Sequence, residues 1–116
     1  MAKENIIIDK TFEFSLRIIE LYKYLTIEKK EYILSKQLLK SATSIGANVE
    51  EATAAQSRKD FLSKMSIASK EARETTYWLR LLMKSDYITN GSILNNSIEI
   101  KKIITSIVKT TSAQKN

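Results

Sequence analysis

Residues 37–83 decide the fold of this chain, and they read QLLKSATSIGANVEEATAAQSRKDFLSKMSIASKEARETTYWLRLLM. Two long helical patterns meet within this stretch at residues 55–58. On the first arm the seam residues recur in alternating steps of four and three: Leu38, Ala42, Ile45, Val49 and Ala52. On the second arm a similar rhythm runs through Phe61, Met65, Ala68, Ala72, Thr75, Leu79 and Leu82. Residues three and four apart share one helical face, so each arm presents a continuous seam to a partner helix.

A second stripe accompanies the apolar seam of the first arm. It consists of Gln37, Ser41, Ser44, Asn48 and Glu51. Most of these side chains are small or amide-bearing, whereas a solvated face would normally carry long charged ones. One interpretation is an ordinary amphipathic boundary. The other is a helix–helix contact, possible also between subunits, whose polar network fixes the register of the helices.

Residues 37–51, 60–68 and 71–82 together resemble the signature helices of a known family, the four-helix bundle proteins. That family includes proteins encoded by intervening sequences within bacterial 23S ribosomal RNA genes. The resemblance implies an antiparallel, up-and-down four-helix subunit, assembly into a ring of five, and no known enzymatic activity. Retroelement accessory proteins of similar shape bind a reverse transcriptase and nucleic acid, which is a more distant analogy.

Composition supports an all-α chain. A length of 116 residues is typical of one domain, here residues 1–116, and 43% hydrophobic residues can form a core. Two glycines and no proline leave long helices uninterrupted. Gly46, inside a helical pattern, is explained most simply by the close approach of another helix. The absence of cysteine and histidine removes disulfides, thiolate nucleophiles and the commonest metal ligand and general base.

The patterns predict four helices joined by connections of roughly five residues, which make neighbouring helices antiparallel. The expected helices run from residue 9 or 11 to 25, over 31–54, over 58–84, and from residue 89 or 92 until the chain frays after 110. The isoleucines at 6–8 are expected to precede the first helix, and its apolar positions include Phe12 and Leu16. Ser57 and Asp60 form a predicted cap for the third helix.

No stretch of the sequence indicates a membrane association. The first ten residues lack the features of a signal peptide, and no apolar run approaches the roughly 20 residues that a span requires. We therefore expect a cytoplasmic protein with no membrane partner.

Charge is distributed unevenly along the chain. The net charge is +6, and residues 57–116 carry all of the excess, with eleven Lys or Arg and five Asp or Glu. This asymmetry predicts a basic surface that could meet the phosphates of RNA or DNA, or an acidic protein. The residues expected to carry nucleic-acid binding are Arg58, Lys59, Lys64, Lys101 and Lys102. Arg73 and Arg80 are not included in this set, because they are candidates for ion pairs between subunits instead.

Two observations limit the functional hypotheses. No basic run is interleaved with aromatic residues in the manner of base-stacking modules, which leaves a protein-binding adaptor as the alternative function. The carboxylate clusters lack the histidines that di-metal bundles use, so we expect no enzyme, no catalytic residue, no metal and no cofactor. Instead, Glu51, Asn48 and Glu74 are expected to share a polar network. Trp78 is expected either to cap the core or to contact a neighbouring subunit.

Overall fold

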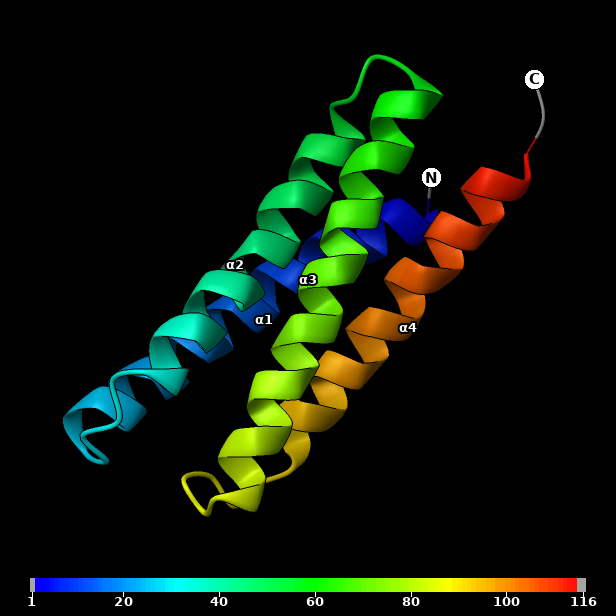
Figure 1. The fold of residues 1–116 in the computed structure, drawn as a ribbon. Coiled ribbons are helices and arrows are strands. Elements are labelled where there is room, and N and C mark those ends of the chain that lie inside the picture. The colour runs from blue at the N-terminus through cyan, green and yellow to red at the C-terminus, as the bar shows by residue number, and fades with distance from the viewer. Residues whose placement is uncertain (1, 115–116) are drawn as a thin grey trace.

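The computed structural model describes residues 2–114 of the chain, with side chains from residue 6 to residue 114. The described part folds into α1 (Ala2–Ile27), α2 (Leu34–Thr53), α3 (Arg58–Lys84) and α4 (Ser92–Ala113), and contains no strand. The helices lie along an elongated body of 51 × 22 × 21 Å (Figure 1). The prediction of an all-α chain with four helices is confirmed, and assembly into a ring stays a prediction.

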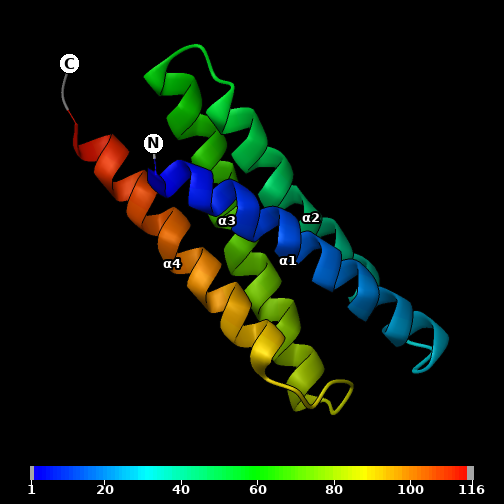
Figure 2. The ribbon, with the colours of Figure 1, turned by 180° about the vertical axis from the view of Figure 1, so that it is seen from behind.

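Each helix packs against the next one in the sequence, and α1 also contacts α4. The contact between α2 and α3 is the most extensive, and that between α1 and α4 is the least. Figure 2 shows the reason, because α1 crosses the bundle obliquely and diverges from α4 toward its own C-terminal end. The short connections make successive helices antiparallel, as expected for an up-and-down arrangement.

The core is formed along the two seams that the sequence predicts. Almost every seam residue of α2 and α3 is fully buried, with the half-buried Phe61 as the exception. Gly46 faces α1, where a Cβ atom would lie 3.5 Å from both Ser15 Oγ and the carbonyl oxygen of Thr11. The expected approach of another helix at Gly46 is therefore found, although the space would admit one further carbon.

The first helix differs from its prediction. It begins at Ala2 rather than at residue 9 or 11, and Ile7 lies inside it with no exposed surface. Phe14 and Ile18 continue the buried line of this helix at steps of seven and four residues. By contrast, Phe12 and Leu16 are 57% and 46% exposed, since they project from an adjacent face. The expectation that Ile6–Ile8 precede the helix was wrong because nothing in the first ten residues breaks it.

The second helix begins three residues later than predicted, and Glu31 is the cause. Its carboxylate accepts hydrogen bonds from the backbone amides of Ile33 at 3.1 Å, Leu34 at 2.9 Å and Ser35 at 2.7 Å. Burial by itself would raise the pKa of this carboxyl. The three amide bonds outweigh that cost and hold the pKa below its ordinary value of 4.5. Glu31 therefore satisfies the free amides at the start of α2 from outside the helix.

The ends of the other two helices agree more closely with the sequence. α3 has the predicted bounds, and the Asp60 amide donates to Ser57 Oγ at 3.0 Å, which confirms the predicted cap. α4 begins at Ser92, one of the two predicted starts, and continues to Ala113 instead of fraying after residue 110. Thr111, buried near that end, packs the last turn onto the bundle. The last two residues of the predicted tail lie outside the described part.

Candidate nucleic-acid interface

Two neighbouring threonines orient α3 between its partner helices. Thr75 Oγ1 donates to Ser41 Oγ of α2 at 2.9 Å, and Thr76 Oγ1 lies 2.8 Å from Ser97 Oγ of α4. All four hydroxyl groups belong to buried residues, so each bond satisfies polar atoms that water cannot reach. Positions that share the side of Thr75 therefore face α2, and positions that share the side of Thr76 face α4.

The flank of α3 that faces α4 is basic. Three hollows of about 430, 400 and 610 Å³ open along α3 and α4, which run side by side in both ribbon views (Figures 1 and 2). No carboxylate is among the described residues that line them. Their basic lining residues are Arg58, Lys59, Arg80, Lys84, Lys101, Lys102 and Lys109. We call this set the α3/α4 basic face.

The carboxylates of α3 occupy the other side of the helix. Glu71 lies one turn before Thr75, and its backbone carbonyl accepts a hydrogen bond from the Thr75 hydroxyl. At 100° per residue, Asp60 and Glu74 fall on the same half of the helix as Glu71. None of these carboxylates forms an ion pair within the described part of the chain. The separation of charge across α3 leaves the α3/α4 basic face without a neutralising partner from the same helix.

Four of the five predicted binding residues lie on this face, and Lys64 does not. Arg58 and Lys59 line the hollow at the start of α3, while Lys101 and Lys102 line the hollow on α4. Lys64 precedes Thr75 by eleven residues, which is about three helical turns, so it lies on the side that faces α2.

The sequence prediction omitted other basic residues of the face. Arg80 and Lys84 line the hollow at the far end of α3, and Lys109 lies beside the lysines of α4. The sequence spacing could have placed Arg80 on this face. Lys59 and Arg80 are 21 residues apart, which is three heptads, so both lie on one side of α3.

The polar stripe of α2 contributes one bond between helices. Ser41 is buried and accepts from Thr75, whereas Asn48 Nδ2 donates to the Ser44 carbonyl of its own helix at 2.9 Å. Gln37 and Glu51 are exposed, and Ser44 is half-buried. Glu74 is also half-buried, and no hydrogen bond joins Asn48, Glu51 and Glu74 among the described side chains. Within a single chain, Ser41 is therefore the one residue of the stripe that the described hydrogen bonds join to another helix, and a network of the whole stripe stays a prediction.

Trp78 lies on the outer flank of α3 and is half-buried. Its indole Nε1 is buried and has no hydrogen-bond partner in the described part of the chain. Its ring meets the ring of Tyr77 edge-on, with centroids 5.2 Å apart. An indole N–H usually finds an acceptor when it is buried, so this donor is unusual in a single subunit.

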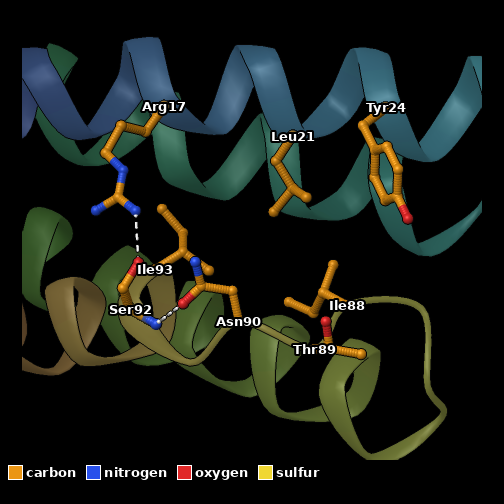
Figure 3. Close-up of a pocket in the computed structure, with 8 residues that line it drawn as sticks. All are labelled: Arg17, Leu21, Tyr24, Ile88, Thr89, Asn90, Ser92 and Ile93. Atoms are coloured by element: carbon orange, nitrogen blue, oxygen red, sulfur yellow. Dashed lines mark hydrogen bonds between the residues drawn. The ribbon is translucent and has the colours of Figure 1, made fainter.

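A further pocket, of about 300 Å³, lies where α1 diverges from α4 (Figure 3). Arg17 of α1 bridges to α4, since its guanidinium donates to Ser92 Oγ at 2.9 Å and to Asn96 Oδ1 at 3.0 Å. The Ser92 amide in turn donates to Asn90 Oδ1. Further along the contact between α1 and α4, Lys10 forms an ion pair with Glu99 at 3.2 Å. Of the residues that line this pocket, Arg17 and Ser92 therefore serve to join α1 to α4.

The part of the chain that the structure describes contains neither a cluster of metal ligands nor a helix that could span a membrane. Its aspartate and glutamate residues form no group of three or more that could hold a metal ion. Of the four helices, none is both long enough and apolar enough to cross a membrane.

These features define a small all-α protein of four helices with one basic face. The profile of the 23S rRNA-intervening sequence protein family matches residues 3–109, and the chain belongs to this family. It is also similar to a crystal structure of a protein with unknown function from the S23 ribosomal protein family of Bacteroides thetaiotaomicron VPI-5482. The two sequences are 55% identical, the TM-score is 0.89, and the match covers 92% of this chain and 98% of the other. The comparison with curated proteins gave no match.

Proposed function

We propose that the protein is a non-catalytic, cytoplasmic bundle that assembles into a homo-oligomeric ring and binds RNA or DNA through the α3/α4 basic face. The observation that carries this proposal is the separation of charge across α3. Seven basic side chains line the hollows along α3 and α4, while the acidic side chains of α3 lie on the half of that helix that carries Glu71. Such a face is suited to bind the phosphate groups of a nucleic acid. Cations without ion-pair partners displace the counterions of the polyanion on binding, and the release of these counterions favours the complex.

Self-association is the second part of the proposal. Ile67 is 40% exposed on the outer flank of α3, where Trp78 keeps a buried, unpaired N–H. A neighbouring subunit would cover Ile67 and the exposed part of the Trp78 ring beside it. The number of five subunits rests on the family resemblance alone. Light scattering coupled to size exclusion should then give five times 13.3 kDa. A stable monomer at micromolar concentration would exclude the ring.

Nucleic-acid binding is tested by comparing two triple variants that remove the same charge. One replaces Arg58, Lys59 and Lys102 of the face by glutamine, and the control replaces Lys29, Lys36 and Lys40, which are exposed outside the face. Fluorescence anisotropy with a labelled oligonucleotide at low salt should show a large loss of affinity for the first variant. The control should retain most of the wild-type affinity, apart from the general loss of net charge.

A protein-binding adaptor is the second candidate, and one observation favours it. Large apolar side chains are exposed at the end of α1 and in the connection that follows it, with Ile27 61%, Tyr32 56% and Ile33 73% exposed. Exposed apolar groups close together are typical of protein contacts. If the wild-type protein binds neither RNA nor DNA at low salt, this adaptor function replaces the first proposal.

A further inference from the structure

Tyr77 lies on α3 near two cations of the α3/α4 basic face, Arg80 and Lys84, and near Arg73, which does not belong to that face. Arg73, Tyr77, Arg80 and Lys84 follow one another in steps of four, three and four, so α3 projects them from one side. Tyr77 is 50% exposed, although an aromatic side chain of this size could bury far more of its surface. A helical period therefore brings together an aromatic ring and basic groups that are separated in the sequence.

A hollow of about 400 Å³ opens directly beside the Tyr77 ring. Its lining is largely apolar and comes from both helices, with Met83 from α3 and Ile98 from α4 among the lining residues. Arg80 and Lys84 also line it, and neither has an ion-pair partner in the described part of the chain. The site thus combines a flat ring, an apolar cavity and two free positive charges.

We propose that this hollow holds an unpaired base of single-stranded nucleic acid, stacked on Tyr77, with the adjoining phosphates on Arg80 and Lys84. Stacking on an aromatic ring together with cations along the backbone is how proteins hold single strands without reading their sequence. A base inside a duplex has both faces covered by its neighbours and cannot enter the hollow unless it is extruded. The inference rests on the proposed function and adds the form of nucleic acid that the face accepts.

The neighbouring tryptophan supplies an internal probe of this site. Trp78 is the only tryptophan of the chain, and its ring centroid lies 5.2 Å from that of Tyr77 at an interplanar angle of 68°. A base that stacks on Tyr77 changes the surroundings of this ring pair. Indole emission should therefore change on titration with an oligonucleotide, and the change should saturate together with the binding curve.

The test compares Tyr77→Ala with Tyr77→Phe and with a control, Tyr32→Ala. Tyr32 is similarly exposed at 56% but lies in the connection between α1 and α2. Binding of a labelled oligouridylate and of a blunt RNA duplex with the same number of nucleotides is measured at one salt concentration. Wild type should prefer the single strand, and Tyr77→Ala should weaken its binding by about fivefold or more. The Phe variant and the control should bind like wild type, because stacking needs the ring and not the hydroxyl.

Two results would overturn the inference. One is single-strand affinity that is unchanged in Tyr77→Ala, and the other is a duplex that binds as tightly as the single strand. If either occurs while the glutamine variant of Arg58, Lys59 and Lys102 still loses affinity, the proposed base-binding site is wrong but the proposed nucleic-acid binding is supported. If the wild-type protein binds neither oligonucleotide at low salt, both the base-binding site and the proposed nucleic-acid binding are wrong. Circular dichroism of Tyr77→Ala checks that α3 remains folded.

Discussion

Replacing Glu31 by alanine should destabilise the protein through the start of α2. The substitution removes the acceptor of three backbone amides, and the Ser35 amide belongs to a fully buried residue. Loss of a helix cap costs up to about 2 kcal/mol, and a buried amide left without a partner costs a similar amount. We therefore expect a loss of about 2 kcal/mol, which for a chain of this length lowers Tm by roughly 8 °C.

Thermal unfolding followed by circular dichroism at fixed protein concentration measures this effect. Glu28→Ala is the matched control, because Glu28 lies in the same connection, is exposed and forms no side-chain hydrogen bond. Glu31→Gln keeps one oxygen acceptor and should fall between the wild type and Glu31→Ala. Equal Tm values for Glu31→Ala and Glu28→Ala would refute the argument that the carboxylate caps α2.

The same carboxylate makes a prediction about pH. Its pKa in the folded protein lies below the ordinary value of 4.5, so the folded state favours the charged form. This contribution to stability is complete at neutral pH and is lost as pH falls through the folded-state pKa. The stability difference between wild type and Glu31→Gln should thus be constant near pH 7 and should shrink below pH 4.5. A difference that grows on acidification would contradict the sign of the shift.

Three further experiments test separate features. Thr76→Val should cost about 1–2 kcal/mol in urea unfolding, because it leaves the buried Ser97 hydroxyl unpaired, and adding Ser97→Ala should recover part of the loss. Gly46→Ala should stabilise the protein by up to about 1 kcal/mol, since the new methyl group meets α1 at an ordinary contact distance of 3.5 Å; a loss of stability would show that the helices cannot accommodate it. In oligonucleotide binding, Lys59→Gln should reduce affinity more than Lys64→Gln, and the reverse order would place the binding surface on the α2 side.

The helical seams were predictable because their signal is a period, and a period depends only on neighbouring residues. The spacing of Leu38, Ala42 and Ile45 indicates a buried face, whichever helix packs against it. The exposure of Phe12 and Leu16 was not predicted, because α1 is apolar on more than one side. Phe12 and Leu16 compete with Phe14 and Ile18 for the core, and only packing against α2 and α4 decides between them. The start of α2 was missed because Glu31 acts through its side chain from outside the helix.

The candidate site shows the same limit. Charge counting along the chain identified the excess on α3 and α4, but it could not assign Lys64 and Lys59 to different sides of α3. That assignment needed the partners of Thr75 and Thr76, which lie on α2 and α4. Tyr77 was missed for a related reason. Its basic neighbours are three and four residues away, so the sequence contains no interleaved run although the helix surface does.

The salt dependence of oligonucleotide binding tests the role of the α3/α4 basic face most directly. Affinity for a single-stranded oligonucleotide should fall linearly on logarithmic axes as salt rises, with each phosphate contact adding about 0.7 to the slope. Replacing Arg58, Lys59 and Lys102 by glutamine should reduce that slope by about 2, while the control variant of Lys29, Lys36 and Lys40 should keep the wild-type slope. If the two variants change the slope equally, the positive charge acts as a whole and the α3/α4 face is not the binding surface.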